Sequence, residues 1–361
     1  FINKRIKLIM AYTTINKSTD YFNTKLYTGN SSTQNITGLD FKPDWVVIKD
    51  RGATNSYMTF DAVRGATKLI NWNTDTAEST QTPTLTSFNS DGFSIGNNTA
   101  LNTNGNNLVA WNWKAGGGQG SANTDGSINT TYTSVNTTAG FSISKFTGNA
   151  TNGATVGHGL GAVPDMIIGK DLGDTSSWGV WHKDLTNAGY RLTLSSTAAQ
   201  SDDSSFFGGS SRTTPTSSVF SLGSGGGLNQ NGSANIVYCF TEKQGYSKFG
   251  KYVGNGNVDG TFVYTGFKPA FVLQKRTDSG STGWGIFDST RSPSNEMKNM
   301  LLANSNAVED TSNAARIDFL SNGFKFRTTD SWFNGSGNPN IYMAFAEAPL
   351  VGTNNTPCTA R

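Results

Sequence analysis

Cysteine, histidine and charge are all scarce in this chain of 361 residues. It contains two cysteines and two histidines, and only 15% of its residues are charged. Two cysteines, Cys239 and Cys358, form no disulfide framework and show no spacing typical of metal ligands. We expect Cys239 to be a packed thiol, and Cys358 to be a free thiol in a polar tail.

Long apolar runs are also missing. No stretch approaches the roughly 18 apolar residues of a membrane helix, so we expect no membrane insertion. The first ten residues, FINKRIKLIM, are basic and then apolar, but the apolar part is too short for a signal peptide. We expect the true start at Met10, with residues 1–9 read from upstream codons. The formal net charge is +3 and the basic residues are scattered, which argues against a nucleic-acid partner.

Glycine and aromatic residues, by contrast, are abundant. The chain has 42 glycines and 11% aromatic residues, a composition that favours short strands joined by tight turns. One segment occurs three times: residues 41–50 read FKPDWVVIKD, residues 162–171 read AVPDMIIGKD, and residues 267–276 read FKPAFVLQKR. The sequence therefore predicts three copies of one domain.

Two strands of each copy can be predicted from this repeat. In the quoted segment, Pro43, Pro164 or Pro269 precedes a run that is apolar at odd and even positions, which is typical of a strand buried on both faces. Each copy closes with an aromatic strand, VAWNWK, IVYCFTE or IYMAFAE. Aromatic residues alternate there with smaller ones, Cys239 among them, so we expect this closing strand to be half-buried.

These patterns predict an all-β fold. We expect three tandem jelly-roll-like β-sandwich repeats of about a hundred residues each. The linker between the first two copies is flexible in composition, although its NTTYTSV segment is compatible with an edge strand. The expected parts are an N-terminal lead (1–24), repeat 1 (25–116), a Gly/Ser/Thr/Asn-rich linker (117–144), repeat 2 (145–245), repeat 3 (246–350) and a C-terminal tail (351–361).

Catalytic patterns are not visible. His158 and His182 lie in different predicted elements with no third metal ligand nearby, and no G-x-S-x-G motif supplies a nucleophile, so we expect both histidines to be structural. No pair of carboxylates has the spacing of a sandwich glycosidase. We therefore expect a protein that is not an enzyme and that needs no cofactor.

Acidic residues gather in one inter-strand loop of each copy. We interpret these loops as solvated tips rather than calcium sites, because nothing else in the sequence supports calcium. The clusters are Asp75/Glu78, Asp202/Asp203 and Glu309/Asp310.

A second group of charges recurs at the ends of two strands in each copy. A lysine ends the repeated segment, and in two copies an aspartate ends the next strand, three residues before an arginine. Recurrence in every copy favours an ion-pair or packing role over a binding site. The lysines are Lys49, Lys170 and Lys275, and the pairs are Asp61/Arg64 and Asp288/Arg291. In the second copy, His182 stands in place of the aspartate and Leu185 in place of the arginine.

Four aromatic residues are candidate ligand contacts. Tyr57, Trp178 and Trp284 occupy one aligned position, and Trp332 lies in the polar loop DSWFNGSGN. A flat ring beside Asn, Asp and Gly is suited to stacking on the C–H face of a sugar. The alternative for the aligned trio is core packing, whereas we expect Trp332 to be exposed.

Several segments resemble repeats in proteins encoded by marine tailed phages. Among them are TVGHGLGAVPDMIIGKD, VAWNWKAGGGQGSANTDGS and IYMAFAEAPL. The similar proteins are uncharacterised or are tail-fibre or lectin-like (concanavalin-A-like) domains, and the resemblance covers nearly all of residues 10–361. It implies a virion protein, assembled in the cytoplasm of the bacterial host and built from jelly-roll-like sandwiches. It implies no catalytic residues.

The resemblance and the composition together lead to two main functional expectations. The first is a tail-fibre-like adhesin that binds host cell-surface polysaccharide and, like many tail fibres, is a homo-oligomer. The second is a structural protein that decorates the capsid or tail and binds other virion proteins. Divergent exposed loops would favour the adhesin, and a continuous apolar patch would favour the decorating protein. A glycan depolymerase is a third and weaker candidate.

Overall fold

The computed structural model describes residues 12–312 and 315–352 of the chain. Met10 and Cys358, for which the sequence gave expectations, lie outside these residues. The described part is all-β, as predicted, apart from the 3-10 helix η1 (Ser18–Asp20) and the four-residue helix α1 (Thr99–Asn102). None of its helices is both long enough and apolar enough to cross a membrane.

Strands β1–β9, which we call unit 1, form a large and a small antiparallel sheet. The large sheet has the order β1-β9-β3-β4-β5-β6, and the small sheet has the order β2-β8-β7. The strands are β1 (Phe22–Thr28), β2 (Gln34–Thr37), β3 (Trp45–Asp50), β4 (Met58–Asp61), β5 (Lys68–Asn71), β6 (Ser79–Thr80), β7 (Leu85–Asn89), β8 (Gly92–Ile95) and β9 (Asn107–Trp113).

Strands β10–β18, which we call unit 2, follow the same plan with one extra strand at the edge. The large sheet has the order β10-β11-β18-β13-β14-β15-β16, and β12 pairs with β17 in the small one. The strands are β10 (Thr130–Asn136), β11 (Phe141–Thr147), β12 (Thr155–Gly157), β13 (Met166–Asp171), β14 (Gly179–His182), β15 (Tyr190–Thr193), β16 (Ser201–Asp202), β17 (Val219–Ser221) and β18 (Ala234–Phe240).

Strands β19–β26 form unit 3, which again has a large sheet (β19-β26-β21-β22-β23) and a small one (β20-β25-β24). In all three large sheets the last strand of the unit (β9, β18 or β26) lies beside the strand that carries the repeated segment, and its other neighbour is β1, β11 or β19, respectively. The strands are β19 (Ser247–Val253), β20 (Phe262–Tyr264), β21 (Phe267–Arg276), β22 (Gly285–Asp288), β23 (Leu301–Leu302), β24 (Ile317–Leu320), β25 (Gly323–Phe326) and β26 (Pro339–Pro349).

Each unit is a β-sandwich with its own core between the large and the small sheet. In unit 1, Val46 and Ala110 of the large sheet pack with Phe93 and Ile95 of the small sheet. Separate clusters fill the same position in units 2 and 3. The opposite face of each large sheet is also apolar, so it needs a second partner layer.

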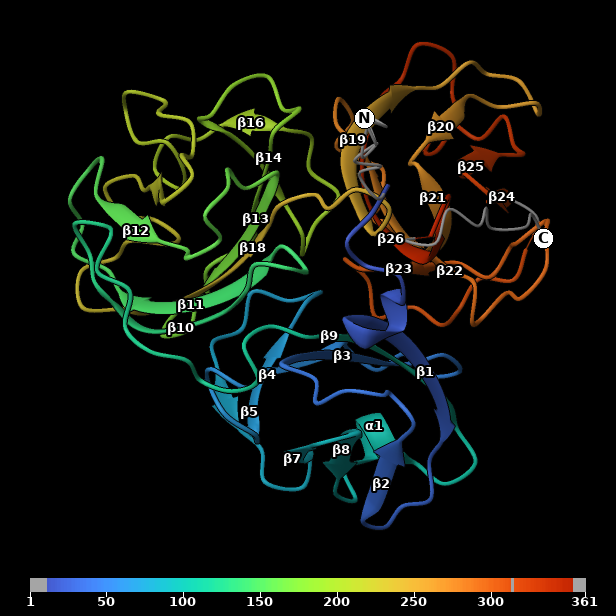
Figure 1. Cartoon of the computed structure of the whole chain (residues 1–361), viewed down its shortest axis with the longest axis horizontal. Helices are drawn as coiled ribbons and strands as arrows, with labels where there is room; N and C mark the ends of the chain where they lie inside the picture. The colour runs from blue at the N-terminus through green and yellow to red at the C-terminus, as the bar shows by residue number, and fades with distance from the viewer. Residues whose placement is uncertain (1–11, 313–314, 353–361) are drawn as a thin grey trace, which may run out of the picture.

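That second layer is supplied by the other two units. The three large sheets face a common centre, around which the units are arranged in Figure 1. One cluster of buried side chains joins all three sheets, and within it the Trp45 ring of unit 1 stacks on the Tyr238 ring of unit 2 at 4.3 Å. Its largest members include Trp45, Trp113, Phe141, Tyr238, Phe240, Phe271 and Phe345.

Burial on both faces confirms one strand prediction and corrects another. Strands β3 and β13 are buried at every position, as the repeated segment predicted. The closing strands were expected to be half-buried, and this is wrong, because β9 and β18 are buried at six of their seven positions. Their aromatic faces reach the common core, whereas the smaller face, which includes Cys239, packs inside its own unit.

The segment expected to be a flexible linker contains regular structure. All of NTTYTSV after its first residue, Asn129, falls within β10, an edge strand that pairs with β11. Strand β11 begins at Phe141, which also lies within the expected linker. The expected lead is also packed in its described part, since Ile15 and Phe22 belong to the common core. The exact domain boundaries stay a prediction.

Candidate functional site

Three of the four candidate sugar-binding aromatics are buried. Tyr57, Trp178 and Trp284 expose no more than 1% of their surface. The prediction that they contact a ligand directly is therefore wrong. Each lies in the common core, which is the packing alternative that the sequence left open. The Trp178 indole donates to the carbonyl of Asn71 in unit 1 at 2.8 Å, and Trp284 donates to that of Thr193 in unit 2 at 2.9 Å. The two tryptophans therefore bind neighbouring units together.

Trp332 is half-buried rather than exposed. It packs against the core of unit 3, and its ring lies 6.4 Å from that of Phe333. The loop is held by the Gln274 amide, which donates to the Trp332 carbonyl at 3.1 Å. A ligand contact at Trp332 stays a prediction, but only part of its ring is available for stacking.

The recurring aspartates and arginines form buried ion pairs, as predicted. Arg64 Nε lies 2.5 Å from Asp61 Oδ2, and Arg291 Nε lies 2.5 Å from Asp288 Oδ2, all with side chains that expose nothing to solvent. Each aspartate also accepts a bond from the next unit. The Trp111 indole donates to Asp288 at 3.1 Å.

Of the two roles expected for the recurring lysines, ion pairing or packing, the structure shows packing in the core with hydrogen bonds to backbone carbonyls. Lys49, Lys170 and Lys275 are fully buried and donate to backbone carbonyls of the loop that follows their own strand. Lys49 Nζ, for example, lies 2.6 Å from the carbonyl oxygen of Asp50 and 2.9 Å from that of Ala53. Burial lowers the pKa of each of these three lysines to about 8.

Two of the acidic loops are not solvated tips, contrary to expectation. Glu309 is almost buried and joins two units, because it binds Arg291 of unit 3 at 2.8 Å and Arg51 of unit 1 at 2.6 Å. Glu78 binds Arg64 at 3.2 Å. Within residues 12–312 and 315–352, no group of three or more His, Cys, Asp or Glu side chains could hold a metal ion.

Both histidines are buried and held by backbone groups, as expected for structural residues. His182 Nδ1 accepts from the N–H of Asp184 at 3.1 Å, and its Nε2 faces the carbonyl of Tyr342 at 3.4 Å. His158 is held in the same way by Leu160 and Thr216. Burial lowers the pKa of His182 to about 3, so this ring is neutral near pH 7.

An open cleft lies where the connector between units 2 and 3 meets the end of β20. We call it the tyrosine cleft. Its volume is about 290 Å³, and it is lined by Tyr12, Glu242, Gln244, Lys248 and Tyr264, among others. The Tyr264 side chain is 52% exposed. Tyr12 is fixed beside it, because its hydroxyl donates to the Gly266 carbonyl at 2.8 Å.

Charges in the tyrosine cleft are balanced. Glu242 binds Lys183 at 3.0 Å and Lys248 at 2.9 Å. Burial alone would raise the pKa of Glu242, but hydrogen bonds and charge from these lysines hold it below its ordinary value. The carboxylate is thus an ionised acceptor near pH 7 and a poor proton donor.

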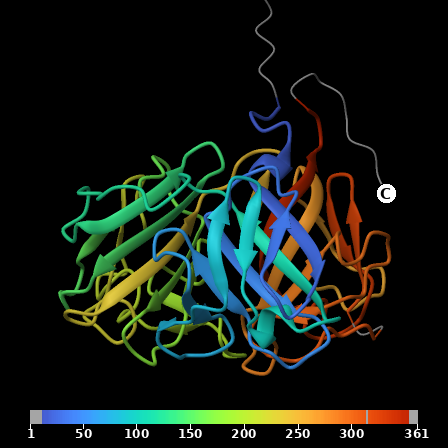
Figure 2. The same cartoon turned by 90° about the horizontal axis from the view of Figure 1, so that it is seen from below.

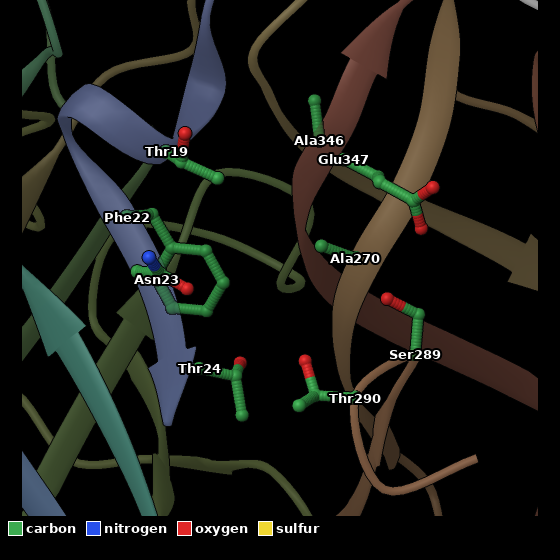
Figure 3. Close-up of a pocket in the computed structure, with 9 residues that line it drawn as sticks. All are labelled: Thr19, Phe22, Asn23, Thr24, Ala270, Ser289, Thr290, Ala346 and Glu347. Atoms are coloured by element: carbon green, nitrogen blue, oxygen red, sulfur yellow. The ribbon is translucent and has the colours of Figure 1, made fainter. Parts of the chain in front are cut away.

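A second cleft, of about 260 Å³, lies at the seam between units 1 and 3. We call it the threonine cleft. Figure 3 shows Thr19, Phe22, Asn23 and Thr24 on the side of β1, facing residues of unit 3 that include Ser289, Thr290 and Glu347. Hydroxyls, an amide and a carboxylate therefore surround one aromatic ring.

The sequence did not identify either cleft. Tyr264 stands in the run TFVYTG, which reads as an ordinary alternating strand. Its exposure depends on β20 being the edge strand of the small sheet. Thr24 could have been noticed as a polar residue in the first strand of a repeat, at a position that is apolar in the other copies, but only after the strands had been paired.

The chain belongs to a protein family described as a domain of unknown function (DUF7483), whose model matches residues 17–349. The match runs from η1 to the end of β26 and thus includes all three units. No curated protein matches the chain.

Proposed function

We propose that this protein is a non-enzymatic, tail-fibre-like adhesin of a phage virion that binds host-surface glycan. The virion part of the proposal rests on the sequence resemblance. The glycan part is carried by one structural observation, the exposed Tyr264 ring in the tyrosine cleft beside ionised and amide side chains. Aromatic faces take the C–H faces of sugars, and carboxylates and amides accept and donate to the hydroxyls.

Several features of the tyrosine cleft favour binding over catalysis. Among the residues that the structure describes, Glu242 is the one carboxylate in the lining, and its two lysine partners hold it ionised. Glycoside hydrolysis needs two carboxyl groups, one of which must be protonated at the start of the reaction. The rigid core that joins the units also fits a protein that presents a preformed surface.

Affinity for a single sugar chain is expected to be weak. The cleft is open to solvent, and shallow sugar sites gain strength mainly when several sites engage one surface. On a virion that carries many copies, avidity would supply this gain.

The test is binding of residues 10–361 to whole marine bacterial cells and to envelope polysaccharide stripped from them. Tyr264→Ala should abolish saturable binding, and Trp332→Ala should show whether that ring adds to it. The matched control is Phe262→Ala, because Phe262 lies on the same strand and is 44% exposed but does not line the cleft. Unchanged binding by Tyr264→Ala would exclude this cleft as the glycan site.

A second candidate function, decoration of the capsid or tail, is favoured by a different observation. Val253, Val258, Phe262 and Tyr264 are all exposed, and they belong to neighbouring segments of unit 3, where the Thr261 hydroxyl donates to the Val253 carbonyl. Exposed apolar side chains grouped in this way are typical of protein–protein contacts. In that case Phe262→Ala should release the protein from purified virions, whereas glycan binding should be absent from both variants.

A further inference from the structure

The three interfaces between neighbouring units, which we call seams, have the same arrangement of strands but differ in their side chains. In each unit the closing strand pairs with a corresponding strand, β1, β11 or β19, and this register identifies matching residues. Thr24 pairs with Trp111 in unit 1, Ile143 pairs with Tyr238 in unit 2, and Phe249 pairs with Met343 in unit 3. Thr24, Ile143 and Phe249 therefore occupy one position, which faces the next unit.

The side chain at this position decides whether a seam is filled. Ile143 and Phe249 both belong to the common apolar core, whereas Thr24 does not. Threonine is shorter than either of them and carries a hydroxyl. The seam between units 1 and 3 is the one that contains the threonine cleft, because its floor lacks the apolar volume present at the other two.

A second difference on the unit 3 side enlarges the same cleft. The residue after the strand's proline is Asp44 in unit 1 and Asp165 in unit 2, where each carboxylate accepts backbone N–H groups that follow the closing strand. In unit 3 it is Ala270, which lines the cleft. The missing carboxylate leaves space next to Glu347, and Glu347 is paired with Lys268 at 2.8 Å.

The lining that results is polar but carries little net charge. Thr19, Ser289 and Thr290 supply hydroxyls, and Figure 3 shows them around the Phe22 ring. The Thr24 hydroxyl at the floor is buried and has no hydrogen-bond partner among the described residues. Within residues 12–312 and 315–352, no lysine or arginine lines the cleft to attract an anion.

We propose that the threonine cleft is a binding site for one neutral sugar ring or a polyol of similar size. Hydroxyl groups that both donate and accept hydrogen bonds match a polyhydroxylated ligand. The volume of about 260 Å³ is below the usual range for larger ligands, roughly 300–1,000 Å³, which limits the occupant to a single ring. This site is separate from the tyrosine cleft and does not depend on the adhesin proposal.

The experiment is calorimetric titration of the protein with glucose, galactose, mannose and glycerol at millimolar concentrations, with glucuronate as the anionic comparison. At least one neutral sugar should bind, and glucuronate should bind more weakly because of Glu347. Thr24→Ile introduces the residue of unit 2, fills the floor and should weaken binding at least about tenfold. Thr290→Val tests the opposite wall by removing a hydroxyl without changing its volume.

Two controls make the outcome decisive. Thr28→Val lies on the same strand, at an exposed position outside the cleft, and should bind like the unchanged protein. Tyr264→Ala should also leave this binding unchanged, which separates failure here from failure of the adhesin proposal. The inference is overturned if no neutral sugar binds, if glucuronate binds best, or if Thr24→Ile binds normally while its melting temperature shows that it is folded.

Discussion

The phenol of Tyr238, on the closing strand of unit 2, donates a 2.7 Å hydrogen bond to the carboxylate of Asp61 in unit 1. Trp111 of unit 1 makes the matching contact with Asp288 of unit 3. At the third seam both partners differ together, since Met343 stands in the donor position and His182 in the acceptor position. The three seams thus share one arrangement, and where the aspartate is absent Met343 and the neutral His182 replace the hydrogen-bonded pair.

Removing the Tyr238 hydroxyl should weaken the seam between units 1 and 2. Tyr238→Phe keeps the stack on Trp45 but removes a hydrogen bond to a charged acceptor, which is worth about 1.5–3 kcal/mol. Urea unfolding should show a loss of this size. Tyr190→Phe, at a half-buried tyrosine, is the matched control and should change the free energy of unfolding much less. Equal effects of the two variants would show that the seam bond contributes nothing.

The buried ion pair should be far more sensitive than a surface pair. Arg64→Leu leaves the Asp61 carboxylate buried without its cation, and breaking such a pair costs about 3–5 kcal/mol. Arg212→Leu removes an arginine whose bridge to Asp202 is partly exposed, and it should cost about 0–1 kcal/mol. Thermal unfolding of both variants side by side measures the difference. A small loss in Arg64→Leu would mean that water or another cation reaches Asp61.

His182 should make the fold sensitive to acid. Its pKa is about 3 in the folded protein and about 6.5 when unfolded, so the unfolded state binds the extra proton between these values. The contribution of neutral His182 to the free energy of unfolding is therefore fully present above about pH 6.5. It is lost as the pH falls toward 3, at up to about 1.4 kcal/mol per pH unit. Denaturant unfolding from pH 7 to pH 4 should show a shallower decline in His182→Gln. His158→Gln is the comparison at the other buried histidine, and an identical decline in both variants and the parent would exclude His182.

The parts of the fold that the sequence predicted are those set by local pattern. The period-two alternation and the repeated proline identified the strands, and Asp61 and Arg64 were identified as a pair by their spacing. The burial of Tyr57 and of the closing strands could not be predicted, because it depends on how the units pack around one another. A strand with one aromatic face looks half-buried until a second unit covers that face. The clefts were missed for related reasons, since the threonine cleft exists where one copy departs from the others and the exposure of Tyr264 depends on the pairing of β20.

The buried lysines should make the protein more stable, not less, as the pH rises above 8. Lys49, Lys170 and Lys275 have a pKa of about 8 when folded and about 10.4 when unfolded. Between these values the unfolded chain holds more protons, so the free energy of unfolding increases with pH. Below pH 8 all three are charged in both states, and the fold bears the full cost of burying them. The rise should end near pH 10, where tyrosines begin to ionise in the unfolded chain but not in the core, as burial raises the pKa of Tyr238.

Urea unfolding at pH 8 and pH 9.5 measures this rise directly. Lys170→Met removes one of three equivalent groups and should reduce the rise by about a third. The same variant leaves the carbonyls of Asp171 and Asp174 without their donor, so its stability at pH 9.5 should fall below that of the parent. Lys145→Met, at a half-buried position on β11, should keep the full rise. If stability instead falls over this range in the parent protein, the folded chain holds more protons than the unfolded chain, which would contradict the lowered pKa of the three lysines.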